Sequence, residues 1–189
     1  MTKVHWRKWY PQIEYSDDVK LSDVLATLPG NDPNEISWIV KLIENPESKW
    51  ALPGAISLFE HDVVHILLGR GLLPQDEAFV IGFTMGNASG LRMYHTMIFK
   101  FFARFLYPKI YRFTKDQLKI FDLGVKYGKS RMFKNIHEVD MIEDVNETIN
   151  SLKKKYYIDT DKLKEIMKEE IKIIPDSKVT ERLKEQLDV

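Results

Sequence analysis

Apolar side chains recur every three to four positions along most of the chain, which is the spacing typical of amphipathic helices. Runs that alternate between apolar and polar residues, as half-buried strands do, are rare. We therefore expect an all-α fold, a single-domain helical bundle. A first long helix is predicted from Asp32, a favourable N-cap followed by Pro33, to about Asn45.

Two further helices are predicted to form a hairpin. The first begins near Pro53 and ends at Gly69 and Gly71, since glycine commonly terminates helices. The second begins at Pro74 and reaches about Asn87. Because only a short turn separates them, the two helices should pack antiparallel to each other.

More helices are indicated farther along the chain. Apolar residues at helical spacing predict one over 91–106. Thr114 with Gln117 three residues later forms a capping-box pattern and predicts a helix toward Gly128. Another is predicted over 141–157. Most of the chain should therefore be helical.

Composition narrows the class of protein. The chain has 189 residues, of which 44% are hydrophobic, and this length suits one domain with a hydrophobic core. We divide it into a helical domain at 1–158 and a charged helical C-terminal extension at 159–189, which we expect to be peripheral. The 28 basic and 28 acidic residues balance, which argues against a protein that grips nucleic acid through a basic surface.

The absence of cysteine excludes thiolate metal sites, disulfides and cysteine nucleophiles, so any metal must be held by His, Asp or Glu. The amino terminus carries charges and aromatic residues rather than the apolar stretch of a signal peptide. The longest uncharged stretch, 78–91, is shorter than the roughly 20 residues of a spanning helix. We expect a cytoplasmic protein, with peripheral attachment to the inner face of a membrane left open.

The residues that carry candidate chemistry lie around the predicted hairpin. His61 and His65 are four residues apart and therefore stack on one helix face, with Asp62 within about 100° of them. Glu77 follows His65 after eleven intervening residues, in the first turn of the second helix, and the hairpin returns it toward the level of His65. Two imidazoles with one or two carboxylates form the ligand set typical of zinc or a similar divalent ion.

Simpler explanations stay open for this pattern. A His pair at this spacing can be accidental, and Glu77 can simply favour the positive end of the helix dipole. Against this, three adjacent ionisable groups on an otherwise apolar helix would be costly to bury unpaired. The pattern also differs from the His-Glu-x-x-His of metalloproteases, because Asp62 has a shorter reach and is better placed as a ligand or as an acceptor that orients an imidazole.

The motif His61-Asp62-x-x-His65, followed after eleven residues by Glu77, resembles the metal-binding signature of the ubiquinone (coenzyme Q) biosynthesis family usually called Coq-four. The resemblance covers about 20–158. It implies an all-helical fold, a divalent metal, expected to be zinc, held by these four residues, binding of isoprenoid tails and peripheral contact with membranes. It also implies a link to the quinone biosynthetic complex and to oxidative removal of a ring carboxyl group.

A stripe of residues with almost no side-chain volume follows the second hairpin helix, at Ala78, Gly82, Gly86 and Gly90. Glycine inside a helix costs about 1 kcal/mol relative to alanine, so the stripe requires a compensating contact. Two explanations stay open. Either another helix packs closely against the stripe, or the stripe is a groove for the apolar tail of a lipid.

Arg70 and an aromatic stripe each allow two interpretations. Arg70, in the turn beside the proposed metal, either steers a substrate carboxylate or phosphate or is a solvated turn residue. The stripe at Met97, Phe101, Phe102 and Phe105 is expected to belong to the core, with a lipid-facing surface as the alternative.

These residues support two main functional hypotheses. In the first, an enzyme uses the metal site, with His61, His65 and Arg70 as catalytic residues, in the oxidative decarboxylation of a prenylated aromatic precursor of ubiquinone. In the second, a non-catalytic scaffold binds isoprenoid lipid and presents it to other quinone-biosynthesis proteins. A metal-dependent hydrolase is a third, weaker alternative. The expected partners are the precursor or lipid, those proteins and a membrane surface, without nucleic acid, and a homodimer stays open.

Overall fold

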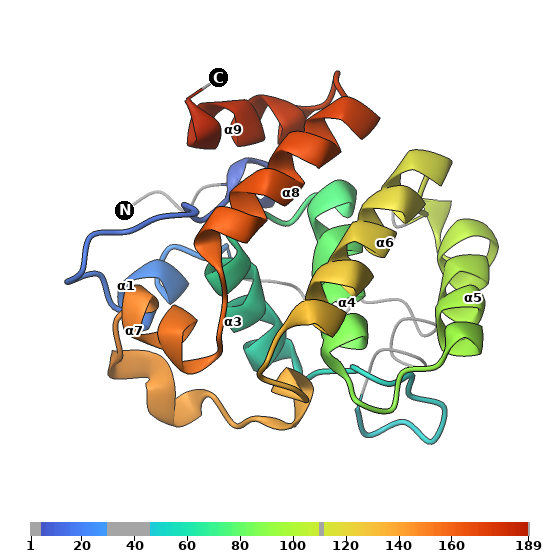
Figure 1. Cartoon of the computed structure of the whole chain (residues 1–189), viewed down its shortest axis with the longest axis horizontal. Coiled ribbons are helices and arrows are strands. Elements are labelled where there is room, and N and C mark those ends of the chain that lie inside the picture. The colour runs from blue at the N-terminus through green and yellow to red at the C-terminus, as the bar shows by residue number, and fades with distance from the viewer. Residues whose placement is uncertain (1–4, 30–45, 110–111, 189) are drawn as a thin grey trace.

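The computed structural model describes residues 5–29, 46–109 and 112–188 (Figure 1). Throughout these ranges the regular structure is helical and no strand forms, which confirms the all-α class. The helix expected from Asp32 lies outside the described residues. The α-helices follow in the order α1 (Leu21–Leu25), α3 (Leu58–Leu68), α4 (Pro74–Asn87), α5 (Met93–Phe101), α6 (Lys115–Ser130), α7 (Ile149–Lys155), α8 (Thr160–Ile173) and α9 (Lys178–Leu187).

Helices α3 and α4 form the expected hairpin, and single residues explain their boundaries. Gly69 takes the left-handed backbone conformation, with a φ of 65°, and ends α3. Pro74 is the first residue of α4, where its missing N–H has no intrahelical partner to lose. Helix α3 begins at Leu58 rather than near Pro53, because Gly54 adopts a φ of 91° that a right-handed helix does not contain.

The backbone of α6 packs directly against the glycine stripe of α4. A methyl group built on Gly82 would overlap the carbonyl oxygen of Phe121, and one built on Gly86 would overlap the carbonyl oxygen of Val125. The stripe therefore serves the close packing of two helices, the first of the two explanations. The alternative, a lipid groove along Gly82 and Gly86, is wrong because α6 occupies that space.

This helix contact is reciprocal, since α6 has glycines of its own at the same spacing. Gly124 and Gly128 lie against backbone carbonyl oxygens of α4, again closer than a methyl group would allow. The two ends of the stripe differ from its middle. Ala78 is fully buried, whereas Gly90 lies beyond α4 with open space around it, so the four residues do not line one groove.

The C-terminal segment 159–189 contributes to the core, so the expectation that it is peripheral is wrong. Leu163 and Met167 of α8 and Leu183 of α9 are buried in the same hydrophobic cluster as the apolar face of α3. Figure 1 shows α8 and α9, in orange and red, lying over the end of the hairpin that carries the connecting turn. The charge-rich sequence hides this burial, because the apolar residues occupy only one face of each helix.

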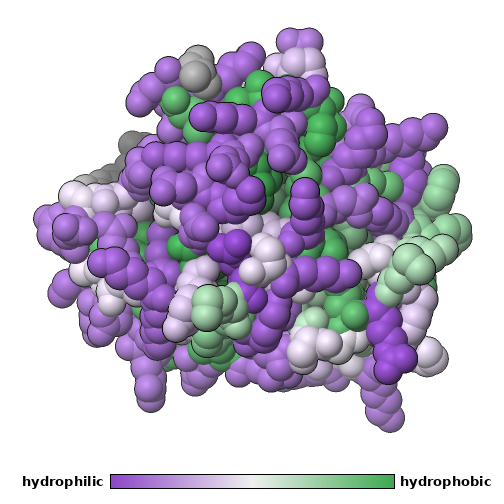
Figure 2. Space-filling view, in the orientation of Figure 1, coloured by the Kyte–Doolittle hydropathy of each residue, from purple (hydrophilic) through white to green (hydrophobic). Residues whose placement is uncertain are grey.

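The aromatic stripe of α5 and of the π-helical turn Phe102–Leu106 lies largely on the surface. Met97 is 64% exposed, Phe101 54% and Phe105 59%, so the expectation of a core stripe is wrong for these residues. Phe99, on the opposite face, anchors the helix in the core instead. Figure 2 shows pale green apolar atoms at the right edge of the molecule, over α5. Among the described residues, no helix has the length and apolar character needed to cross a membrane.

The helix expected over 141–157 is interrupted. A short 3-10 turn, Ile142–Asn146, precedes α7, and Thr148 caps α7 by accepting a hydrogen bond from the Ser151 N–H. The carbonyl oxygen of Glu147 accepts from the N–H of Leu21 in α1. At Glu147, a hydrogen bond with the N-terminal part of the chain thus takes the place of a hydrogen bond within a helix.

Candidate metal centre

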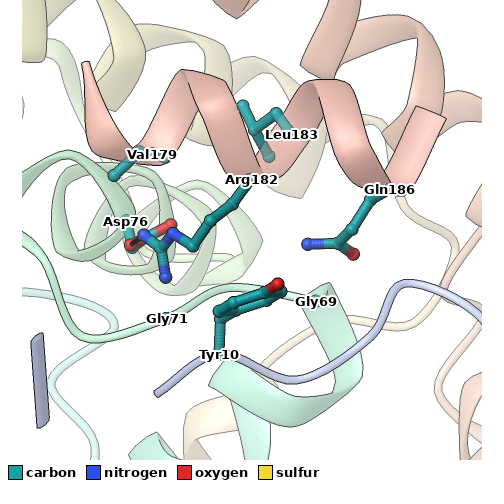
Figure 3. Close-up of a pocket in the computed structure, with 8 residues that line it drawn as sticks. All are labelled: Tyr10, Gly69, Gly71, Asp76, Val179, Arg182, Leu183 and Gln186. Atoms are coloured by element: carbon teal, nitrogen blue, oxygen red, sulfur yellow. Dashed lines mark hydrogen bonds and ion pairs between the residues drawn. The ribbon is translucent and has the colours of Figure 1, made fainter. Parts of the chain in front are cut away.

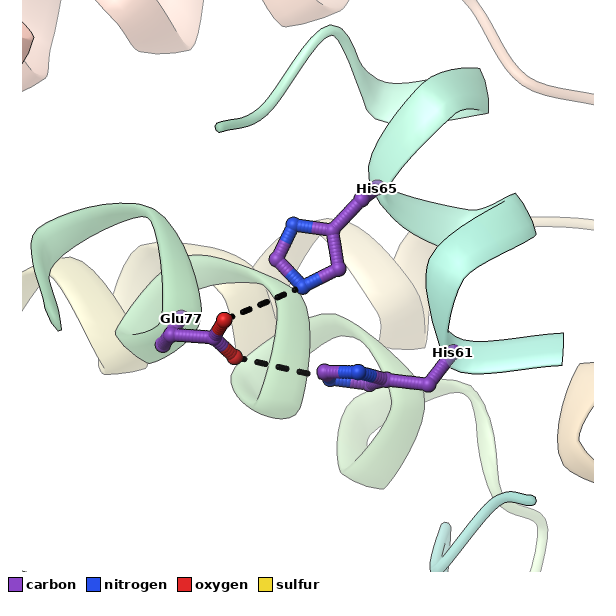
Figure 4. A group of neighbouring side chains, drawn as sticks. All are labelled: His61, His65 and Glu77. Carbon is purple, nitrogen blue, oxygen red and sulfur yellow. Dashed lines mark ion pairs between the residues drawn. The ribbon is translucent and has the colours of Figure 1, made fainter. Parts of the chain in front are cut away.

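His61 and His65 lie one turn apart on the same face of α3 and present their rings toward the first turn of α4. Their ring centroids are 4.6 Å apart and the rings are nearly perpendicular, at 83°. Figure 4 shows Glu77 reaching toward both rings from α4. Its Oε2 atom lies 3.6 Å from Nε2 of His61, and its Oε1 atom lies 3.4 Å from Nε2 of His65. The hairpin thus brings these three side chains together, as expected.

The spacing of the three side chains suits a tetrahedral metal ion. One potential ligand atom from each residue lies within 4.8 Å of the other two. Ligands at about 2.0–2.1 Å from tetrahedral zinc are separated from one another by about 3.3 Å, close to the two measured distances. Two imidazole nitrogens beside one carboxylate are a ligand set that zinc and similar divalent ions accept.

Two buried nitrogen atoms at this site, Nε2 of His61 and Nε2 of His65, have no hydrogen-bond partner. Buried polar atoms are normally paired, because an unpaired one costs about 1–3 kcal/mol. The side chain of His65 is fully buried, while those of His61 and Glu77 are 20% and 28% exposed. Coordination to a divalent ion would satisfy both nitrogens, and the partly exposed side of the site gives an ion access. The residues present therefore fit a metal.

Burial and mutual interaction set the protonation of the metal-free site. Burial, and then the neighbouring His65, lower the pKa of His61 to about 4, so its imidazole is neutral near pH 7. Burial also acts to lower the pKa of His65, but the carboxylates of Glu77, Asp62 and Asp76 outweigh it and raise that pKa. Burial acts to raise the pKa of Glu77, but the two histidines outweigh it and lower that pKa. Without a metal, His65 and Glu77 therefore stabilise each other's charged forms, while burial favours the neutral form of His61.

The second ring nitrogen of His65 is held by the backbone. Nδ1 lies 3.3 Å from the carbonyl oxygen of Arg70, just past the end of α3. An Nδ1–H that donates to this carbonyl leaves the Nε2 lone pair free to bind a metal, which is the tautomer that coordination requires. A backbone acceptor leaves no signature in the residue types, so sequence reasoning missed this contact.

Asp62 stands outside the three-residue group, so the structure does not bring all four expected ligands together. Burial, and then the carboxylate of Glu77, raise the pKa of Asp62 to about 6, against the opposing effect of His65. Asp62 is therefore an electrostatic neighbour of the group. Its position on the helix explains the difference, because consecutive residues point about 100° apart and Asp62 follows His61 directly.

Arg70 is fully buried, which excludes its interpretation as a solvated turn residue. Its Nη1 atom lies 2.6 Å from Oε2 of Glu170 on α8, and its guanidinium group lies 4.0 Å from the ring centroid of Phe79. Steering of a substrate carboxylate would require Arg70 to leave Glu170, so the contacts favour a role inside the fold. Sequence reasoning missed Glu170 because it is 100 positions away in a charge-rich segment.

The group can supply three protein ligands, two imidazoles and one carboxylate. Structural zinc sites are closed by four protein ligands, whereas catalytic sites use three and keep a position for water or substrate. Among the described residues, the group offers three ligands, the number that catalytic zinc sites use. Compared with models of protein families, with curated proteins and with solved structures, the chain has no match in any of the three.

Proposed function

We propose that the chain binds zinc or a similar divalent ion through His61, His65 and Glu77 and acts on a prenylated aromatic precursor of ubiquinone. The observation that carries the metal part is the pair of buried Nε2 atoms that have no hydrogen bond and that both face the carboxylate of Glu77. The substrate class rests on the resemblance of the motif to the Coq-four signature. The reaction we propose is the oxidative decarboxylation of that precursor.

A bound divalent ion would supply Lewis-acid stabilisation of the negative charge on a ring hydroxyl or carboxylate. In the overall change, an aryl carboxylic acid, dioxygen and water give a phenol, carbon dioxide and hydrogen peroxide. Glu77 contributes one negative charge and the two neutral imidazoles none, so the three ligands would leave a bound divalent ion with a net positive charge that favours an anionic substrate and that the neighbouring carboxylate of Asp62 partly offsets. The Arg70 carbonyl keeps His65 oriented for this role.

A second candidate function, a non-catalytic scaffold that works at a membrane, is favoured by the exposed side of α5. We define the α5 apolar face as Met93, Met97, Phe101 and Phe105, which are 77%, 64%, 54% and 59% exposed. Contiguous exposed apolar side chains mark contact surfaces.

Exposed basic residues lie near both ends of this face, Arg92 before it and Lys109 after it. Such residues suit anionic lipid headgroups. In the scaffold function the α5 apolar face lies on the membrane, the metal orders the hairpin, and the protein presents a membrane-borne precursor to other enzymes. The glycine stripe takes no part, because α6 covers it.

One set of measurements on the same preparations separates the two functions. Zinc and extracted lipid are quantified by mass spectrometry in the wild type, in His65→Ala and in His95→Ala, a control histidine on α5. Carboxylated prenyl-phenols are then assayed with and without a chelator. Turnover that disappears with the chelator and in His65→Ala, but not in His95→Ala, supports the enzyme. Stoichiometric lipid without turnover supports the scaffold, and a preparation with neither zinc nor lipid contradicts both.

A further inference from the structure

Helix α8 holds both sides of the turn that joins α3 to α4. The fully buried carboxylate of Glu170 accepts a hydrogen bond from Nη1 of Arg70 at 2.6 Å and another from Nε2 of Gln75 at 2.8 Å. Arg70 follows the glycine that ends α3, and Gln75 lies in the first turn of α4. One carboxylate from the C-terminal segment thus connects the two halves of the hairpin.

Helix α9 makes a second connection to the same turn. Nη2 of Arg182 lies 2.5 Å from Oδ2 of Asp76, and that oxygen also accepts a hydrogen bond from the N–H of Leu73 at 3.3 Å. Figure 3 shows Arg182 reaching from α9 toward Asp76 and over the ring of Tyr10. Gly71 leaves room for this guanidinium group, because a methyl group there would overlap it.

The residues held by α8 and α9 are immediate neighbours of the candidate ligands. Asp76 directly precedes Glu77, and the carbonyl oxygen of Arg70 is the acceptor for Nδ1 of His65. A shift of the turn would therefore move the acceptor away from His65 and alter the approach of Glu77 to both imidazoles. Contacts that orient metal ligands in this way typically change metal affinity by about 10–100-fold when they are removed.

We propose that α8 and α9 position the ligands of the candidate metal centre, and that Glu170 is the main positioning residue, acting through Arg70 and Gln75. The inference rests on the proposed metal site for its functional meaning. Neither Glu170 nor its two partners belongs to the ligand group. The C-terminal segment thereby holds the candidate ligands in position, and we refer to these contacts of α8 and α9 with the turn as the brace.

Three variants of the full-length protein test the brace. Glu170→Gln keeps the shape of the side chain but leaves Arg70 without its counter-ion. Gln75→Met removes the hydrogen bond to Glu170 and the one that Gln75 Oε1 accepts from the Ser177 hydroxyl group, but it preserves the buried Arg70–Glu170 ion pair, so we expect it to fold. Asp144→Asn is the matched control, because Asp144 is also buried and pairs with Lys155 on a different part of the chain.

Two quantities are measured for each variant. The first is the dissociation constant for zinc, from calorimetric titration of metal-free protein. The second is amide hydrogen exchange over 69–77 without metal. Glu170→Gln and Gln75→Met should weaken zinc binding by about tenfold or more, while Asp144→Asn should stay within about twofold of the wild type. The turn amides should exchange faster in the first two variants only.

Wild-type zinc affinity in both Glu170→Gln and Gln75→Met overturns the positioning role, whatever the exchange shows. An equal loss in Asp144→Asn also overturns it, because the effect would then be general destabilisation. If the wild type binds no zinc, the proposed metal site is wrong. Amide hydrogen exchange over 69–77 then shows by itself whether Glu170 and Gln75 hold the turn in place. Faster exchange in the first two variants but not in the control then supports the brace, and any other result overturns it.

Discussion

The ring Nδ1 atom of His65 lies 3.3 Å from the carbonyl oxygen of Arg70, so the residue just past the end of α3 orients a candidate ligand on that helix. The side chain of the same Arg70 forms a buried ion pair with Glu170 of α8 at 2.6 Å. One residue therefore connects the candidate metal centre with the C-terminal helices.

Zinc affinity should fall as the pH is lowered from about 7.5 to about 5. The carboxylates near His65 raise its pKa above the ordinary value of 6.5, so a proton competes with the ion for Nε2. Below that pKa the dissociation constant should rise about tenfold per pH unit, because one pKa unit corresponds to about 1.4 kcal/mol. Calorimetric titrations across this range measure the slope. A flat profile would show that protonatable imidazoles do not hold the ion.

The stability of the metal-free protein should depend on pH through His61. Its pKa is about 4 in the folded protein against 6.5 ordinarily, so the unfolded chain binds more protons between these values. The contribution of His61 to the free energy of unfolding therefore falls as the pH drops from 6.5 to about 4.

The shifted pKa values of two other groups at the site affect stability over different pH ranges. The raised pKa of His65 contributes stability that is present below 6.5 and is lost as the pH rises through the folded value. The lowered pKa of Glu77 contributes stability that is present above 4.5 and is lost at lower pH. His61→Asn removes the first effect and also the part of the lowered pKa of Glu77 that His61 causes, so urea unfolding should show a smaller loss of stability on acidification. An unchanged profile would contradict the burial of a neutral His61.

The ligand set can be tested by exchanging each carboxylate for its amide. Glu77 belongs to the group of three potential ligands and Asp62 does not. Glu77→Gln should weaken zinc binding beyond the roughly 10–100-fold range of outer contacts, and Asp62→Asn should remain within that range. Competition with a chromophoric chelator gives both constants. Equal losses would mean that Asp62 is a ligand and that the group has four members.

The contact between α4 and α6 predicts that substitution of one glycine of the stripe destabilises the protein and that substitution of another has little effect. Gly86→Ala places a methyl group against the backbone of Val125 and should lower the free energy of unfolding by about 2–3 kcal/mol. Gly90→Ala meets open space and should change it by less than about 1 kcal/mol. Thermal or urea unfolding distinguishes them. A stable Gly86→Ala protein would reopen the lipid-groove explanation.

The α5 apolar face predicts binding to vesicles. Sedimentation with vesicles of phosphatidylcholine and anionic phosphatidylglycerol should carry down the wild type, and the double variant Phe101→Ser, Phe105→Ser should bind more weakly. Both side chains are more than half exposed, so the unfolding free energy should change by less than about 1 kcal/mol. Met132→Ser, at a position that is 80% exposed on another segment, is the control. Vesicle binding that is equal in all proteins would remove α5 from the membrane contact.

The hairpin could be predicted from the sequence because local chemistry determines it. Gly69 and Pro74 end and start helices through their own backbone preferences, and the four-residue spacing of His61 and His65 places both on one face in any helix. Glu77 then converges with them because the turn is short. Each of these steps depends on neighbours in sequence.

Contacts between distant segments could not be predicted in this way. The glycine stripe has the same pattern whether a helix or a lipid covers it, and only Gly124 and Gly128 of α6, packed against it, decide between the two. The stripe of α5 has helical periodicity on either a buried or an exposed face. Glu170 is one of many carboxylates in a charged segment, and its partner Arg70 lies 100 positions upstream.

The central claim, that His61, His65 and Glu77 hold a metal ion, is tested most directly by titrating zinc into metal-free wild-type and His65→Ala protein. The structure predicts that the wild type binds one zinc ion per chain and that His65→Ala loses this binding while keeping its helical content by circular dichroism. A wild type that takes up no zinc, or a folded His65→Ala that binds it as tightly as the wild type, would contradict the claim.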